Sequence, residues 1–150
     1  RHLVILSGLY GVLRPLDRLQ PYRLEMGTAL RVQRTKDLYG YWGDTLAEHL
    51  NERQAEEAEP VVVNLASIEY SRAALRKALR ARVVDCVFED WKGSGYKVIS
   101  FFAKQARGMM ARHAIVKRAV QPQQLEDFAT EGYTFDRAAS EPDRLVFRRR

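Results

Sequence analysis

A chain of 150 residues that is 46% hydrophobic and 29% charged has the length and composition of a globular protein with one core. No apolar run reaches the roughly 20 residues of a membrane helix, so we expect no membrane partner. The net charge of +6 favours an anionic partner, and the single cysteine, Cys86, excludes an internal disulfide and is typical of a buried thiol in the reducing cytoplasm.

Residues 3–6 form an apolar run that predicts a strand already under way, and we expect an N-terminal region to be missing. Residues 7–27 follow as a loop rich in glycine and proline, in which residues 9–13 favour a helical turn that ends before Pro15. Residues 45–54 have helical spacing after a possible N-cap at Asp44. Residues 52–60 are polar and predict an exposed connection.

Residues 61–65 are a continuous β-branched run, which predicts a strand buried on both faces. Ser67 then occupies the N-cap position of a helix that we expect to reach about residue 82. Residues 83–91 and 96–101 predict two strands around the hairpin signal KGSG. A long helix is expected over residues 102–120, a helical turn over 122–128, and short strands over 132–135 and 145–147. Residues 148–150 are expected to form a solvated end.

This order of elements predicts an α/β (mixed α+β) fold. We expect residues 1–150 to form a single domain in which helices pack on a mixed β-sheet, with no internal repeat.

Polar side chains follow three of the predicted strands at the point where each strand ends. They are Ser7, Tyr10 and Arg14 after the first, Asn64, Ser67, Glu69 and Tyr70 after the second, and Ser100 and Lys104 after the third. If the three strands are parallel, these turns converge where α/β proteins bind ligands, and helix N-termini there favour an anion. The sequence therefore predicts a pocket with residues 7–27 as one wall. In the alternative interpretation, Ser67 only caps a helix and Asn64 only bonds the backbone.

The long predicted helix carries a basic stripe. At about 100° per residue, one face gathers Lys104, Arg107, Ala111 and Arg118. The opposite face gathers Phe102, Ala106, Met109, Met110 and Val116. Small residues beside the cations, such as Gly108, leave room for a phosphate backbone, and plain solvation is the alternative.

The helix after Ser67 is expected to carry a second row of cations, Arg72, Arg76 and Arg80. Like charges at this spacing repel, and phosphate contacts would offset the repulsion. Solvation alone is the safer interpretation of this row.

Other chemistry finds little support in the sequence. His2, His49 and His113 are scattered, and no Walker loop or dinucleotide fingerprint is present. No histidine lies near Ser67 in sequence, so nothing indicates a catalytic triad. We therefore expect no metal, no cofactor and no evident protein partner.

Five stretches resemble, in order, successive blocks of the YaaA family of bacterial peroxide-stress proteins. They are LSGLYGVLRPLDRLQPYRLEMG, KDLYGYWGD, VVVNLASIEYS, VISFFAKQARGMMAR and EGYTFD, and they cover nearly the whole chain. The resemblance implies a cytoplasmic protein linked to survival of hydrogen peroxide through limiting free iron. It also implies an α/β domain of unusual topology, with a basic cleft and a helix-hairpin-helix-like element similar to those of DNA-binding proteins. No established catalytic reaction comes with it.

The resemblance further implies that this chain is the C-terminal part of a family member. The matching positions are Tyr10, Arg14, Tyr22 and Arg23 in the first block, and Asn64, Ser67, Glu69, Tyr70, Lys104 and Arg107 in later blocks. Ile68 departs from the acidic residue expected in some members, which weakens an acid role beside Ser67.

These residues give two leading hypotheses. In the first, a stress protein binds double-stranded DNA through phosphate contacts from Arg14, Arg23, Lys104, Arg107 and Arg118. In the second, an enzyme acts on a nucleotide or nucleobase in a pocket lined by Ser7, Tyr10, Tyr22, Asn64, Ser67, Glu69 and Tyr70. One closed concavity would favour the enzyme, and cations along an open surface would favour DNA. Direct iron binding is a third reading that ligand spacing does not support.

Overall fold

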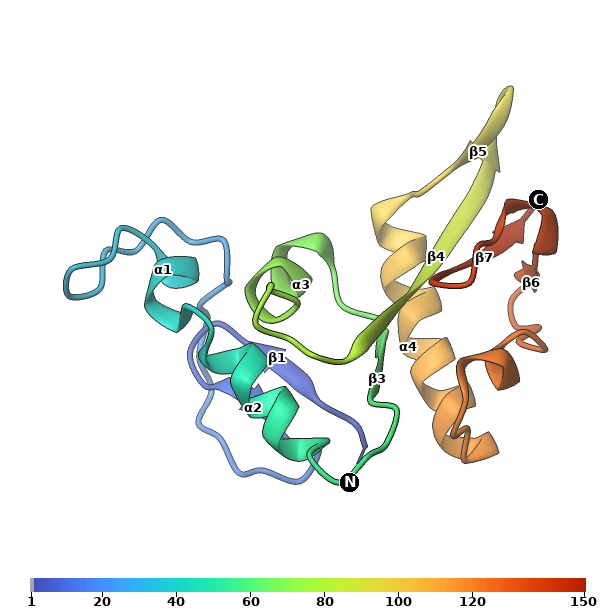
Figure 1. Ribbon diagram of the computed structural model, residues 1–150. Coiled ribbons are helices and arrows are strands. Elements are labelled where there is room, and N and C mark those ends of the chain that lie inside the picture. The colour runs from blue at the N-terminus through green and yellow to red at the C-terminus, as the bar shows by residue number, and fades with distance from the viewer. Residues whose placement is uncertain (1) are drawn as a thin grey trace. The chain divides into compact units, whose positions relative to one another are not determined.

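The computed structural model describes residues 2–150, which form two compact units (Figure 1). The first unit contains the chain up to Pro60 together with Ala66–Ala81, and the second contains Val61–Leu65 with Arg82–Arg150. Each unit has its own apolar core. The chain therefore leaves the first unit for one strand, returns to it, and then completes the second unit.

The first unit combines a β-hairpin with short helices. Strands β1 (Ile5–Ser7) and β2 (Gly11–Leu13) pair antiparallel. Helices α1 (Leu38–Trp42), α2 (Thr45–Arg53) and α3 (Ile68–Ala74) complete the unit. Their core contains Met26, Leu38, Leu46, Leu50, Ala73 and Ala74.

The helical turn predicted over residues 9–13 is wrong, because the chain turns back there as strand β2. Gly11 adopts a φ of +72°, which a residue with a side chain rarely adopts. A Cβ at Gly11 would also lie 2.8 Å from the ring of Trp42. The hairpin thus depends on a long-range contact with α1 that periodicity does not reveal.

Helix α3 ends at Ala74 rather than near residue 82, so the predicted row of Arg72, Arg76 and Arg80 does not form. The following segment is instead held by the side chain of Asn51 in α2. Its amide nitrogen donates to the carbonyl oxygen of Ala78 at 2.8 Å, and its oxygen accepts from the N–H of Arg80 at 2.8 Å. These two bonds satisfy backbone groups that a longer helix would have paired internally.

Neither predicted cap makes a side-chain capping bond, although both helices begin where expected. Asp44 precedes α2 but accepts from Nε of Arg76 at 2.7 Å, and Ser67 precedes α3 in an extended conformation. The capping bond occurs in α1, where Asp37 accepts from the N–H of Gly40 at 2.8 Å. Asp44 therefore binds an arginine that is distant in sequence and does not cap the helix that it precedes.

The second unit is built on a mixed five-stranded sheet of order β3-β4-β7-β6, with β5 paired to β4. The strands are β3 (Val61–Asn64), β4 (Arg82–Lys92), β5 (Gly95–Lys97), β6 (Thr134–Phe135) and β7 (Arg144–Arg149). Strand β4 is parallel to β3 and β7, and β5 and β6 are antiparallel to their neighbours. Helix α4 (Ser100–Lys117) and the short 3-10 helices η1 (Pro122–Leu125) and η2 (Arg137–Ala139) complete the unit. The mixed α/β class expected from the sequence is confirmed, including the KGSG hairpin.

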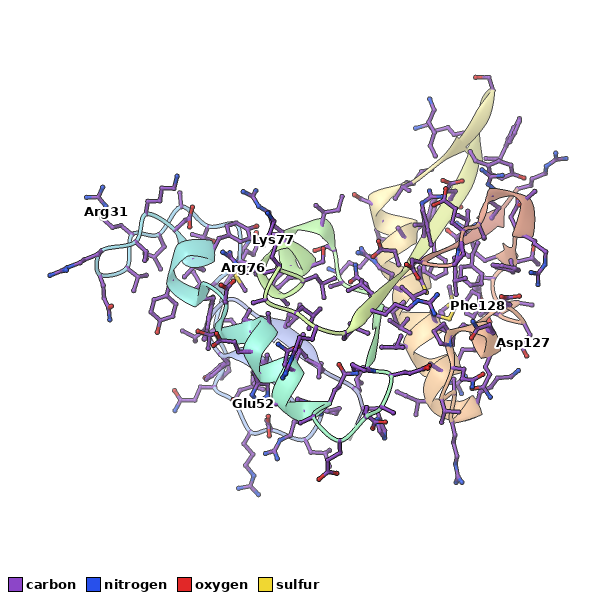
Figure 2. All side chains as sticks on the ribbon, viewed as in Figure 1. Arg31, Glu52, Arg76, Lys77, Asp127 and Phe128 are labelled. Atoms are coloured by element: carbon purple, nitrogen blue, oxygen red, sulfur yellow. The ribbon has the colours of Figure 1, made fainter. Side chains whose placement is uncertain are left out.

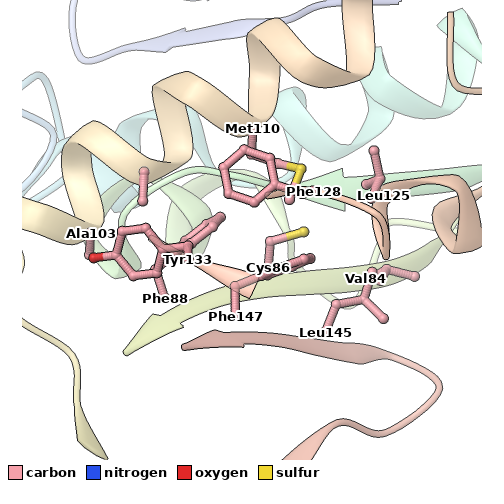
Figure 3. Packing of buried hydrophobic residues seen from close by; sticks show 11 residues of the cluster. Val84, Cys86, Phe88, Ala103, Met110, Leu125, Phe128, Tyr133, Leu145 and Phe147 are labelled. Atoms are coloured by element: carbon pink, nitrogen blue, oxygen red, sulfur yellow. The ribbon is translucent and has the colours of Figure 1, made fainter. Parts of the chain in front are cut away.

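Strand β4 alternates, and its even positions build the core beneath α4 (Figure 3). Phe88 stacks on Phe147 with ring centroids 5.3 Å apart and meets Phe128 and Tyr133 edge to face. Cys86 is in the same row, which agrees with the buried thiol expected. Strand β3 is only partly buried along its length, so its predicted burial on both faces is wrong.

The buried face of α4 differs from the predicted one. It consists of Ala103, Ala106 and Met110, whereas Phe102 and Val116 are 37% and 69% exposed. Arg118 lies outside the helix as a left-handed C-cap, so it does not extend the basic stripe. Two of the three buried residues of α4 are alanines, which periodicity alone does not distinguish from the larger apolar residues nearby.

Candidate functional site

Three of the predicted pocket residues form one cluster in the first loop. Ser7 is 1% exposed, and its Oγ accepts from the backbone N–H of Tyr10 at 2.9 Å and hydrogen-bonds the hydroxyl of Tyr22. The rings of Tyr10 and Tyr22 meet edge to face at 5.3 Å. The loop is thus closed on itself by Ser7, and it presents two half-exposed tyrosines.

The start of α3 holds the end of the same loop. Glu69 accepts from the N–H of Gly27 at 2.7 Å through Oε1, and its own carbonyl oxygen accepts from the hydroxyl of Tyr39 at 3.0 Å. Burial raises the pKa of Tyr70, which also hydrogen-bonds the backbone at Met26. Glu69 therefore fixes the loop, and one of its carboxylate oxygens is already occupied.

Gly8 shows why this loop requires glycine. A Cβ at this position would lie 2.6 Å from the carbonyl oxygen of Leu24 and 3.2 Å from the carbonyl carbon of Glu25. The carbonyl of Gly8 also accepts from the indole N–H of Trp42 at 3.0 Å.

We predict that Gly8→Ala lowers the free energy of unfolding by about 1–3 kcal/mol, because the backbone at Leu24 and Glu25 must move to make room for the new Cβ. Urea denaturation followed by far-UV circular dichroism measures the change. Gly95→Ala is the control, because a Cβ there meets no heavy atom within 4 Å. Equal losses in the two variants would contradict the close packing of Gly8.

The predicted convergence of three parallel strand ends is wrong. Strand β1 pairs only antiparallel with β2, in a separate sheet, and β5 is antiparallel to β4. Of the three strands, β3 alone has a parallel neighbour, β4. Asn64 lies at the end of β3 in the second unit, where its amide donates to Oδ1 of Asp85 at 2.7 Å. Ser67 is half-buried at the start of α3 in the first unit.

Two predicted phosphate-binding residues of the first loop, Arg14 and Arg23, differ in whether an ion pair already neutralises them. Arg14 forms an ion pair with Asp17 at 2.7 Å, and the hydrogen bond from Arg14 lowers the pKa of that carboxyl. Arg23 is exposed, and no ion pair within residues 2–150 involves it. Arg14 is therefore partly neutralised, and Arg23 is the more available cation.

Helix α4 carries the most distinctive cation. Arg107 is partly buried, its Nε donates to the carbonyl oxygen of Ala103 at 3.1 Å, and burial lowers its pKa. Among the residues that the structure describes, no carboxylate lies within ion-pair distance of Arg107. Lys104, one turn before it on the same face, is exposed. A Cβ at Gly108 would meet no heavy atom within 4 Å, so the surface beside these cations is open.

Sequence reasoning missed the charged groups of the last strand. Arg148 and Arg149, expected in a solvated end, belong to β7 and pair with carboxylates of β4. Arg148 donates to Glu89 at 2.8 Å, and Arg149 forms an ion pair with Asp90 at 2.6 Å. Their position directly after the apolar run of residues 145–147 was the only signal in the sequence.

Over residues 2–150, no group of three or more His, Cys, Asp or Glu side chains is placed to hold a metal ion. None of the helices described is long and apolar enough to cross a membrane.

The two units define a mixed α/β protein, and the predicted phosphate-binding cations lie in the first loop and on or just after α4. Residues 1–139 match the family described as Peroxide stress protein YaaA, and the chain belongs to this family. The match confirms the resemblance seen in the sequence blocks.

Relatives with the family name UPF0246 protein match over almost the entire chain. The chain is 66% identical to one from Methylibium petroleiphilum and 64% identical to one from Paracidovorax citrulli, each over 99% of this chain and 58% of the relative. A relative from Bordetella pertussis is 60% identical with the same coverage. The chain therefore spans about 58% of the length of these curated relatives.

Proposed function

We propose that this chain supplies a DNA-binding surface to a cytoplasmic peroxide-stress protein, and that binding limits oxidative damage linked to free iron. The observation that carries the proposal is the partly buried guanidinium of Arg107, which has no carboxylate partner in the described part of the chain. A cation taken partly out of water without a counter-ion loses solvation, and an external anion restores it. A phosphate group is such an anion, and Arg binds it through a planar fork of donors.

The surroundings of Arg107 fit a polyanion with little base recognition. Lys104 adds a second cation one turn away, and the open space at Gly108 permits close approach of a phosphate backbone. Other arginines of the second unit are instead paired with carboxylates, as in the ion pairs Arg82–Asp143 and Arg144–Glu89. Phosphate contacts of this kind give affinity that falls with salt and varies little with DNA sequence.

Fluorescence anisotropy with labelled duplex DNA, from low to physiological salt, tests the proposal. In Lys104→Ala/Arg107→Met the methionine keeps the apolar stem, and we expect the slope of log affinity against log salt to fall by about 2, one for each lost contact. The matched control is Arg76→Ala/Arg82→Ala, which removes the same charge from two carboxylate-paired residues. Equal losses in both variants, or salt-insensitive binding, would contradict the proposal.

Gly108→Leu probes the same surface without changing charge. Leucine is a better helix former than glycine, so α4 should become more stable by several tenths of a kcal/mol or more. DNA affinity is nevertheless expected to fall, because the new side chain fills the open space beside Arg107. Unchanged affinity would show that DNA does not approach α4 here.

The alternative, an enzyme acting on a nucleotide at converging strand ends, receives less support from the geometry. Its premise was a set of parallel strands, and only β3 has a parallel neighbour among the three. Its acid–base candidate, Glu69, holds the backbone of Gly27 through one carboxylate oxygen.

A further inference from the structure

The second unit contains a hollow of about 410 Å³ beside strand β6 that no predicted site residue lines. Its wall includes Tyr96, Phe135, Asp136, Arg137, Arg148 and Arg150. The volume falls within the range of sites that bind small molecules. Three arginines and one aspartate line this space, so positive side chains outnumber negative ones in its lining, while Glu89 and Glu126 pair with two of these arginines.

Two carboxylates and an aromatic ring hold the guanidinium of Arg148 in place. Its Nε donates to Glu89 at 2.8 Å, its Nη1 donates to Asp136 at 2.8 Å, and its plane lies 4.4 Å from the ring centre of Tyr96. The hydrogen bond to Glu89 is the main reason that its pKa is raised. These two bonds use a minority of the donors of the guanidinium, so others remain for a ligand.

Arg137 is also held by a carboxylate and an aromatic ring. Its Nη2 donates to Glu126 at 2.5 Å, and its guanidinium lies 5.4 Å from the ring centre of Phe135. The side chain is 80% exposed, so its remaining donors are accessible. Two arginines oriented by carboxylates and aromatic rings form a preorganised anion site, because little side-chain entropy is left to lose on binding.

We propose that this hollow binds a small phosphorylated ligand of the nucleoside monophosphate class, with its phosphate between Arg137 and Arg148. A phosphate group accepts the paired donors of a guanidinium at two oxygens. The volume exceeds the needs of phosphate alone, and the hydroxyl of Tyr96 and the side chain of Thr134 add polar groups for the sugar or base. The site involves neither Lys104 nor Arg107, so it is independent of the DNA proposal.

Titration of the isotope-labelled full chain with adenosine monophosphate, inorganic phosphate and adenosine, followed by amide NMR, tests this site. We expect saturable binding of adenosine monophosphate with a Kd of about 1 mM or tighter, with the amides of Thr134 and Phe135 shifting. Inorganic phosphate should shift the same amides at higher concentration, and adenosine should not.

The decisive variant is Arg137→Gln, which removes an exposed charge and leaves the fold intact. We expect it to weaken adenosine monophosphate binding about tenfold, the effect of losing one charge-assisted contact. The control is Arg112→Gln, an exposed cation of α4 that does not line the hollow. Equal weakening in both variants, shifts away from β6, or no saturation would overturn the proposal. DNA binding in Arg137→Gln should be unchanged, so failure here is distinct from failure of the DNA surface.

Discussion

Replacing Asp90 with alanine should lower the free energy of unfolding by about 3–5 kcal/mol, because a buried ion pair loses one partner. Asp90 is 6% exposed and connects β4 with β7 and with the residue just before β6. It accepts from the hydroxyl of Tyr133 at 2.7 Å and forms an ion pair with Arg149 at 2.6 Å. Tyr133 is fully buried, so its hydroxyl would lose its only partner among the described contacts.

The measurement is urea denaturation followed by tryptophan fluorescence in a Trp42→Phe background. Trp91 in strand β4 is then the sole tryptophan of the chain, so the signal follows unfolding of the second unit. Asp143→Ala is a matched control, since Asp143 also pairs with an arginine, Arg82, but its side chain is 63% exposed. An exposed pair of this kind contributes about 0–1 kcal/mol. Asp90→Asn should lie between the two, because it keeps an acceptor for Tyr133 but loses the charge. If Asp90→Ala and Asp143→Ala were equal, the cluster around Asp90 would have no special role.

The elements of the second unit could be predicted because their signals are local. The apolar run before KGSG and the run after it identify β4 and the turn into β5, and the long periodic segment identifies α4. A glycine-bearing turn between two strands needs no distant partner. The same holds for the short strands β6 and β7, although β7 extends to Arg149, beyond the predicted end.

The first unit was less predictable because distant contacts decide its local structure. Gly11 reverses the chain against Trp42, and Asn51 binds the segment after α3 that periodicity assigned to a helix. Both outcomes depend on residues about 30 positions apart, which no local pattern reports. Propensity is a weak prior where such tertiary contacts compete.

The candidate site likewise combines features that local sequence signals predicted with features that depend on distant contacts. Ser7, Tyr10 and Tyr22 meet within one loop, as the density of special residues in that loop suggested. Strand direction, on which the expected convergence depended, cannot be read from apolar runs, because parallel and antiparallel strands share them. The partial burial of Arg107 could not be predicted either. An arginine at the edge of a helix face gives the same sequence pattern whether its side chain is buried or exposed.

The thiol of Cys86 is expected to resist peroxide in the folded protein, despite the family's link to peroxide stress. Cys86 is 7% exposed, and burial, aided by the charge of Asp85, raises its pKa to about 12. Only the thiolate reacts as a nucleophile. Near neutral pH the thiolate population is therefore roughly three to four orders of magnitude below that of an exposed cysteine.

Mass spectrometry after exposure to hydrogen peroxide or iodoacetamide measures this difference directly, with the same chain in urea as the control. We expect modification of Cys86 in urea and little in the native state over the same time. Cys86→Ala should retain the DNA affinity of the wild type, at the cost of about 1–3 kcal/mol from the lost core volume. Rapid oxidation of native Cys86 would instead make this residue a peroxide sensor. If Cys86 stays reduced, thiol chemistry at this residue is excluded as the source of a response to peroxide.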